Sequence, residues 1–283
     1  MDCRKWLDSW KAALTDVGVA RGDILYVASD AALLLAEARR NYGIKTAQDK
    51  DTFLHSVVDI LQETVGSEGT LLFPVFTWDF CRGKGFDVRT TKGEVGALNN
   101  WILTQRNDFR RTQHPLYSFL VWGKEAEPLL ALNNIDAWDE RSPFAYLHRH
   151  HGKMLLLNVS LQRGFTFMHY VERMLRVPYR YLKNFHGSYT DSGGETQERS
   201  YIMYVRDLAV LSHERLPDEM LEEPGVMTAG RWGKLTVKQI DLSRAYDVLA
   251  DDLLHHGGRQ CYHFENYILD WNKGATHEDD LGH

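Results

Sequence analysis

His169 and Glu172 are the residues whose types and spacing most directly suggest chemistry. They stand three positions apart in the helix-compatible stretch 164–172, which follows the apolar run 153–159. Residues three apart lie on one face of a helix, so the imidazole and the carboxylate would be neighbours. A carboxylate beside a His fixes its tautomer and stabilises the imidazolium that forms when the ring takes a proton. The pair is therefore a candidate general base.

The composition is that of a globular chain without a pronounced charge bias. Of its 283 residues 43% are hydrophobic and 12% aromatic, enough for a sizeable core. The formal net charge is −6 and no run of Lys and Arg exceeds two residues, so nucleic acid is not an expected partner. Three widely spaced cysteines without CxxC spacing argue against a disulfide framework or a structural zinc site, and fit a reducing cytosol.

The first residues are not expected to form a targeting segment, and the composition changes at a few points along the chain. Its first residues are polar and aromatic, and no window approaches about eighteen uninterrupted apolar residues. We therefore expect a cytoplasmic protein without membrane insertion. We also expect a single domain over residues 1–272, a small appended α/β subdomain within it at 190–240, and a disordered tail at 273–283.

Hydrophobic periodicity predicts strands and helices that alternate along the first half of the chain. The expected elements are a helix over 3–17, a strand over 23–28, a helix over 50–65, strands over 70–75 and 118–122, and a helix from about 124. This alternation predicts an α/β layered sheet. Ligands bind beyond the carboxyl ends of strands in such sheets, which here means near Ser29, Thr77 and the loop after Val159.

The pattern changes after residue 189. Residues 201–205 and 235–240 alternate as half-buried antiparallel strands do, and a final helix is expected over about 242–256. We expect these two strands to form a small appended sheet, against which the last helix packs.

Several motifs follow one another in a recognisable order. They are residues 22–29, 69–78, 86–91, 96–98 and 111–118, then Ser142-Pro143-Phe144 and the segment 166–172. In order and spacing the chain resembles the aminoglycoside 3-N-acetyltransferase family, also called the antibiotic N-acetyltransferase family, over roughly residues 5–190. The resemblance implies an α/β/α sandwich with a central mixed sheet and a small appended antiparallel sheet subdomain. It also implies transfer of an acyl group from coenzyme A to an amine, usually on a sugar.

The resemblance gives His169 and Glu172 defined roles. A sugar ammonium must lose a proton before its nitrogen attacks a thioester, and His169 matches the family's catalytic histidine. Glu172 would orient His169 or hold the substrate ammonium. Structural roles stay open for both: a buried His satisfied by a backbone carbonyl, and a Glu172 ion pair with one of the arginines at positions 173, 176 and 180.

The same resemblance implies acetyl-CoA, or another short acyl-CoA, as the co-substrate, and no metal. Ser29, Thr77 and Thr112 carry hydroxyls that could bond pantetheine amides or a phosphate, although each could instead be a turn or cap residue. Arg111 is the expected phosphate-binding cation, with a solvated surface Arg as the alternative.

Two further residues are expected near the acceptor. Trp78 follows a strand end beside the expected cofactor mouth, where it would line a sugar-stacking site or fill the core. Asp87 could contact the acceptor or cap a turn, and the turn is favoured.

The chain departs from the family pattern at positions that bear on the acceptor. Many members have His-Ser-Ser where this chain has Ala28-Ser29-Asp30, and the cationic Arg163 would repel a polyamine. The segments 170–172, 177–180 and 183–185 resemble the family branch found with surface-polysaccharide biosynthesis more than the resistance branch. Arg163, Arg180 and Lys183 would suit an anionic acceptor such as a nucleotide-linked amino sugar or a nonulosonic-type acid.

Alternative functions remain open. One is acetylation of aminoglycoside antibiotics, and another is a non-catalytic family member that binds coenzyme A or a partner. A hydrolase using Ser29 or Ser160 is weaker, because neither serine lies in a GxSxG elbow. A homodimer also stays open. The histidines at 148, 150 and 151 lack partners at metal-ligand spacing and are expected at a solvated helix end.

Overall fold

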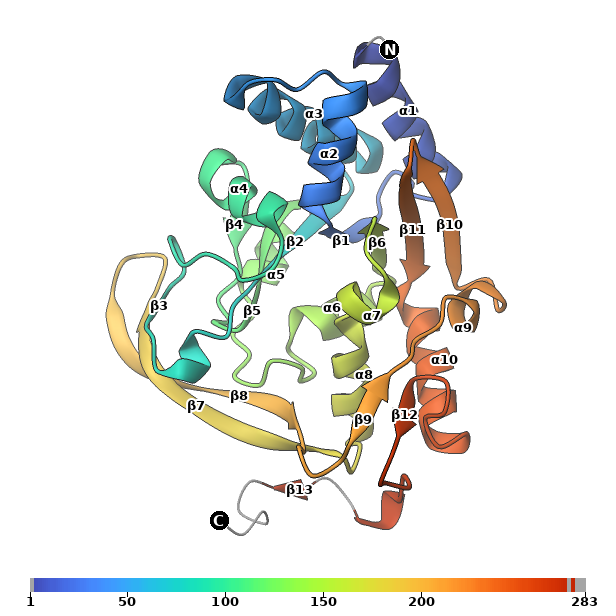
Figure 1. The fold of residues 1–283 in the computed structure, drawn as a ribbon. Coiled ribbons are helices and arrows are strands. Elements are labelled where there is room, and N and C mark those ends of the chain that lie inside the picture. Colours follow the sequence, from blue (N-terminus) through green and yellow to red (C-terminus); the bar gives the residue numbers. More distant parts are fainter. Residues whose placement is uncertain (1–2, 274–275, 278–283) are drawn as a thin grey trace.

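A seven-stranded mixed sheet forms the centre of the molecule (Figure 1). The computed structural model describes residues 3–273 and 276–277. The strand order is β10-β11-β6-β1-β2-β5-β4. In chain order these strands are β1 (Ile24–Ser29), β2 (Thr70–Phe76), β4 (Arg110–Arg111), β5 (Tyr117–Gly123), β6 (Lys153–Leu157), β10 (Met227–Trp232) and β11 (Leu235–Asp241). β1 runs parallel to β2 and β6, and the outer strands pair antiparallel.

Helices cover both faces of this sheet. On β1, Leu25 and Val27 belong to one core cluster, whereas Tyr26 and Ala28 belong to the other, as the period-two alternation of a strand requires. The first cluster packs under α1 (Cys3–Asp16), α2 (Ala31–Asn41), α3 (Ala47–Val65) and α4 (Ala97–Gln105). The second packs under α6 (Pro143–Arg149), α8 (Phe167–Leu175) and α10 (Leu242–His255). The layered α/β/α sandwich expected from the sequence is confirmed (Figure 1).

Two smaller sheets flank the sandwich. A long hairpin of β7 (Arg180–Thr190) and β8 (Thr196–Arg206) curves away from it, and β7 also pairs with β3 (Phe86–Asp87) and β13 (Thr276–His277) (Figure 1). β9 (Ser212–Glu214) and β12 (Tyr262–Phe264) form the other sheet. The remaining short elements are α5 (Ala126–Leu130), α7 (Leu161–Gly164), α9 (Glu219–Glu222) and the 3-10 turns η1 (Phe80–Arg82) and η2 (Trp271–Lys273).

The predicted antiparallel strands exist, but the small sheet expected to contain both of them was wrong for residues 235–240. Residues 201–205 lie in β8, whereas residues 235–240 lie in β11, which pairs with β6 in the large sheet. Alternation shows which side chains of a strand are buried and says nothing about which strand lies beside it. β11 is buried on both sides, since Val237 belongs to one core cluster and Ile240 to the other.

The other predicted elements agree with the structure to within a few residues, including the last helix, found as α10 (Leu242–His255). The domain limits at 1–272 stay a prediction. The predicted tail at 273–283 falls largely outside the described residues. No helix in the described ranges has the length and apolar character needed to cross a bilayer.

Candidate active site

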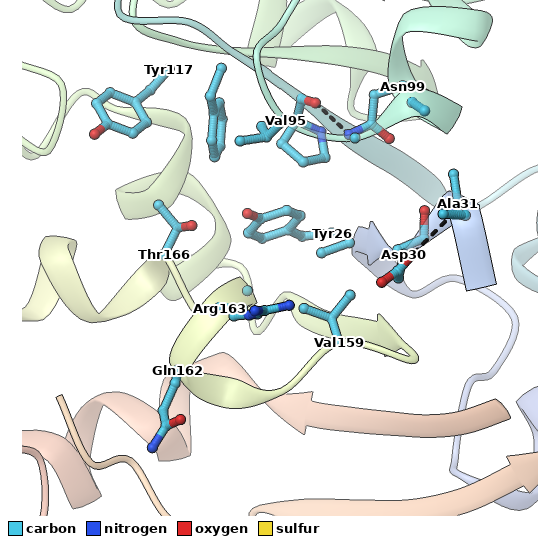
Figure 2. Close-up of a pocket in the computed structure, with 18 of the residues that line it drawn as sticks. Tyr26, Asp30, Ala31, Val95, Asn99, Tyr117, Val159, Gln162, Arg163 and Thr166 are labelled. Atoms are coloured by element: carbon cyan, nitrogen blue, oxygen red, sulfur yellow. Dashed lines mark hydrogen bonds between the residues drawn. The ribbon is translucent and has the colours of Figure 1, made fainter. Parts of the chain in front are cut away.

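A pocket of about 630 Å³ opens beyond the carboxyl ends of the parallel strands (Figure 2). Ser29 reaches it from the end of β1, Trp78 from the loop after β2, and Val159 from the loop after β6. The sequence predicted a ligand site near Ser29, near Thr77, which precedes Trp78, and in the loop after Val159. His169 and Arg163 also line the pocket, so it brings together four of the candidate site residues: Ser29, Trp78, Arg163 and His169.

His169 and Glu172 form a contact on the first turns of α8. The Nδ1 atom of His169 lies 2.8 Å from Oε2 of Glu172. The His169 side chain is 26% exposed, whereas that of Glu172 is fully buried. The imidazole therefore stands between the pocket and a buried carboxylate, as the spacing of three residues predicted.

Glu172 also pairs with Arg180, which comes from the start of β7. Nε of Arg180 lies 2.7 Å from Oε2 of Glu172, and both side chains are almost completely buried. Burial by itself would raise the pKa of Glu172, but the charge of Arg180 and the contact with His169 lower this pKa to about 2. The carboxylate is thus ionised at neutral pH, and the predicted ion pair exists together with the His169 contact.

The two neighbours of Nδ1 place opposite demands on the tautomer of His169. Nη2 of Arg180 lies 3.0 Å from Nδ1, a contact that would require a lone pair on Nδ1. The ionised Glu172 oxygen cannot donate, so its shorter contact requires a proton on Nδ1. Because a bare lone pair facing a carboxylate at that distance would be repulsive, we assign the proton to Nδ1. Nε2 then carries the lone pair that a general base needs.

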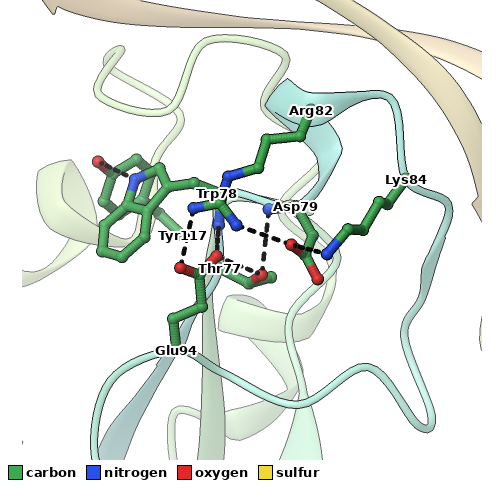
Figure 3. A network of polar contacts seen from close by, with 7 residues as sticks. All are labelled: Thr77, Trp78, Asp79, Arg82, Lys84, Glu94 and Tyr117. Carbon is green, nitrogen blue, oxygen red and sulfur yellow. Dashed lines mark hydrogen bonds and ion pairs between the residues drawn. The ribbon is translucent and has the colours of Figure 1, made fainter.

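A charged network holds Trp78 over the pocket (Figure 3). Glu94 accepts hydrogen bonds from the Trp78 backbone N–H at 2.9 Å and from the Thr77 hydroxyl at 3.3 Å. Arg82 bridges Glu94 and Asp79 at 3.0 and 2.9 Å. The indole N–H donates to the Tyr117 hydroxyl at 3.2 Å, so backbone and ring of Trp78 are both fixed.

We expect Glu94→Gln to loosen this loop. The change removes the charge that Arg82 bridges, and the KM for the substrate that packs on Trp78 should rise about two- to fivefold with little change in kcat. The matched control is Glu68→Gln, which breaks an exposed ion pair with Lys124 elsewhere on the surface. Steady-state kinetics of both variants test this, and an equal response in both would contradict the role of Glu94.

Other residues singled out from the sequence do not line the pocket. Arg111 is buried, and its guanidinium donates to the carbonyl of Val75 at 3.1 Å and to Oγ of Ser118 at 2.9 Å. Burial lowers the pKa of Arg111 to about 10. Thr112 accepts the backbone N–H of Phe119 at 2.9 Å. In this structure Arg111 and Thr112 link strands and loops.

Asp87, Thr77 and Arg180 also lie outside the lining of the pocket. Asp87 accepts the Arg89 backbone N–H at 2.8 Å and pairs with the Arg89 side chain, the geometry of the favoured turn role. Thr77 is buried, and its hydroxyl donates to Glu94. Arg180 faces Glu172 and not the cavity.

Asn99 and Glu214 line the pocket and were missed by sequence reasoning. Asn99 is 2% exposed, its amide donates to the carbonyl of Pro74 at 2.6 Å, and its Oδ1 has no hydrogen-bond partner in the described structure. The buried Oγ of Ser29 likewise has none. Asp30 caps α2 by accepting the N–H groups of residues 32 and 33, and Glu214 reaches the pocket from β9. Ser29 and Asp30 were singled out from the sequence, whereas Asn99 and Glu214 were not.

The histidine cluster has aromatic neighbours. His148 stacks on Tyr246 and contacts the Tyr170 hydroxyl at 3.0 Å, and His150 stacks on Tyr146. Within residues 3–273 and 276–277 no group of three or more His, Cys, Asp or Glu side chains is arranged to hold a metal ion.

The family model described as aminoglycoside 3-N-acetyltransferase matches residues 45–253. No curated protein matches the chain.

Among solved structures, AAC-IIIb in a binary complex with CoASH has a TM-score of 0.68 at 20% identity, covering 88% of this chain and 96% of that chain. Aminoglycoside acetyltransferase AAC(3)-IIb has a TM-score of 0.68 at 22% identity, covering 87% of this chain and 96% of that chain. YokD from Bacillus subtilis has a TM-score of 0.68 at 20% identity, covering 88% of this chain and 99% of that chain. At these identities the likeness concerns the fold.

Proposed function

The chain belongs to the aminoglycoside 3-N-acetyltransferase family and is an N-acetyltransferase, and from this premise we propose that it acetylates an amine of an amino sugar with His169 as the general base. The observation that carries this proposal is the arrangement of the pair at the pocket. Buried, ionised Glu172 holds Nδ1–H of His169, and Nε2 is left for the acceptor.

The proposed reaction is a direct transfer from acetyl-CoA within a ternary complex. The acceptor amine, as its free base, attacks the thioester carbonyl carbon, and Nε2 of His169 takes a proton from the nitrogen as the new C–N bond forms. The C–S bond then breaks, and coenzyme A leaves as a thiolate that takes up a proton. Glu172 stabilises the imidazolium formed in the first step. No covalent enzyme intermediate is needed.

Two buried oxygens support a donor site in the same pocket. Oδ1 of Asn99 can accept an amide N–H, and Oγ of Ser29 can donate to a carbonyl, so together they suit the amides of a pantetheine arm. The fold relative AAC-IIIb is described as a binary complex with CoASH, which also supports this donor. The family points to acetyl-CoA over longer acyl donors.

The charges around the pocket bear on the acceptor. The preference for an anionic acceptor now rests on Arg163, because Arg180 pairs with Glu172 and Lys183 does not line the cavity. Asp30 and Glu214 line it as well. Mixed charge of this kind suits a nucleotide-linked amino sugar, whose phosphates would face Arg163.

A polycationic aminoglycoside is the second candidate. Asp30 and Glu214 favour it, and the family description supports it, whereas Arg163 opposes it. The two acceptors are distinguished by how activity depends on the charge at position 163.

We expect Arg163→Gln to change acceptor preference. kcat/KM should fall about tenfold for a nucleotide-linked amino sugar, through loss of a charge-assisted contact, and should rise for an aminoglycoside. Arg141→Gln removes an arginine that does not line the pocket and serves as the matched control. Equal kcat/KM changes for the two acceptors would rule out Arg163 as the source of charge preference.

A further inference from the structure

Glu172 has four polar neighbours, two on each oxygen. Oε2 faces Nδ1 of His169 and Nε of Arg180, as described above. Oε1 accepts hydrogen bonds from two phenol hydroxyls, that of Tyr179 at 2.9 Å and that of Tyr262 at 2.6 Å. Both tyrosines are buried. If one of their hydroxyls were removed, water could not easily take its place as a donor to Oε1.

Both hydroxyls remain donors over the working pH range. Burial, followed by the nearby charge of Glu172, raises the pKa of Tyr179 and that of Tyr262 well above the ordinary value. A protonated phenol beside an ionised carboxylate can only donate to it. The rotation of the Glu172 carboxylate is therefore set from the Oε1 side by Tyr179 and Tyr262.

Tyr262 comes from a distant part of the chain. It lies 90 residues after Glu172 and beyond residue 253, where the family match ends. Backbone hydrogen bonds hold this part of the chain in place. The N–H of Tyr262 donates to the carbonyl of Gly258 at 2.7 Å, and the N–H of Cys261 donates to the Asp252 carboxylate at 2.9 Å. Its ring packs edge-on against Tyr179 with centroids 5.5 Å apart.

The strand that carries Tyr262, β12, pairs with β9, which contributes a residue to the wall of the pocket. In the antiparallel pair of β9 and β12, Tyr262 stands opposite Glu214, which lines the pocket. One short two-stranded sheet thus carries both Glu214, which lines the pocket, and Tyr262, whose hydroxyl donates to Glu172.

We propose that Tyr262 is a positioning residue, whose hydroxyl holds the Glu172 carboxylate so that Oε2 meets Nδ1–H of His169. This inference rests on the proposed function, in which His169 is the base. Without the Tyr262 hydroxyl, Oε1 loses a hydrogen-bond donor. The carboxylate can then turn toward the guanidinium of Arg180 and form a bidentate ion pair with it. Nδ1 of His169 would then lose its acceptor, and the contact with Arg180 would favour the tautomer protonated on Nε2, which cannot act as the base.

The test compares Tyr262→Phe with Tyr189→Phe. Tyr189 is also fully buried, and its hydroxyl donates at 2.8 Å to the carbonyl of Gln113, so the control loses a comparable hydrogen bond away from Glu172. We expect Tyr262→Phe to lower kcat about tenfold to a hundredfold with unchanged KM for acetyl-CoA. Both substitutions should lower the midpoint of unfolding to a similar extent, but Tyr189→Phe should leave kcat unchanged.

A second measurement needs no acceptor. Nitrogen-15 NMR of the imidazole, with the His169 signals assigned by their loss in His169→Gln, reports which ring nitrogen carries the proton. We expect Nδ1–H in the wild type and in Tyr189→Phe, and a mixture of tautomers in Tyr262→Phe. Tyr179→Phe should shift the tautomer in the same direction, because it removes the other donor to the same oxygen.

The two measurements separate this inference from the proposed function. If the wild type acetylates no amine, the proposed function fails. A tautomer change seen in Tyr262→Phe and Tyr179→Phe but not in Tyr189→Phe would still support the positioning role. If Tyr262→Phe matches Tyr189→Phe in both tautomer and kcat, Tyr262 is a structural residue only and the inference is overturned.

Discussion

His169→Gln is expected to lose about a hundredfold to ten-thousandfold in kcat, the usual contribution of a general base. Glutamine keeps much of the size and polarity of the imidazole but cannot take the proton from the attacking amine. His169 is partly exposed at the pocket, so the fold should tolerate the change. Thiol release from acetyl-CoA measures the rate, and the KM for acetyl-CoA should hardly move.

His55→Gln provides the matched control. His55 also faces an acidic residue on a helix, Asp51, with Nε2 3.6 Å from the carboxylate, but it lies on the exposed face of α3. Its substitution should leave kcat unchanged. A His169→Gln protein with wild-type kcat would remove His169 from the chemistry.

Glu172→Gln should damage stability and activity together. Arg180 is fully buried and its charge is balanced by Glu172, so neutralising the carboxylate leaves an uncompensated buried cation. Removing one member of a buried pair costs about 3–5 kcal/mol in the free energy of unfolding. The loss of the negative charge that stabilises the His169 imidazolium should also lower kcat. Urea unfolding and thiol release measure the two effects.

The double variant Glu172→Gln with Arg180→Met separates these effects. Replacing both charges with groups of similar volume should restore most of the lost stability, because a buried pair and an apolar substitute are often nearly equivalent. kcat should stay low, since His169 still lacks its carboxylate. Recovery of kcat along with stability would mean that Glu172 acts only through folding.

Glu172 also makes the free energy of unfolding depend on pH. Its pKa falls from 4.5 to about 2 on folding, so the folded state binds the proton more weakly than the unfolded state. The resulting stabilisation is complete above pH 4.5 and disappears as the pH falls toward about 2. In the double variant this part of the acid dependence should be absent. Unfolding measured at several pH values in this window checks the sign.

The sequence predicted the core of the site because that part is local. His169 and Glu172 lie within one helix, where spacing alone determines which side chains meet, and the strand ends at Ser29 and Trp78 follow from hydrophobic runs. The parallel central strands then bring those ends to one edge of the sheet.

The parts that could not be predicted depend on long-range packing. Tyr262 and Glu214 reach the site through a two-stranded sheet whose register no local pattern specifies. Arg180 and Arg111 carried charge that suggested anion binding, but a sequence does not show that a guanidinium is buried against a carboxylate or backbone carbonyls. The assignment of residues 235–240 failed for the same reason, since the partner strand β6 lies far away in the chain.

The central claim is that this pocket transfers an acetyl group to an amine of an amino sugar. The most direct test is mass spectrometry of nucleotide-linked amino sugars and aminoglycosides after incubation with acetyl-CoA and the wild-type protein or His169→Gln. We predict one added acetyl group on an amine with the wild type and little or none with the variant. Binding of coenzyme A without any acetylated product would contradict the claim and favour a non-catalytic role.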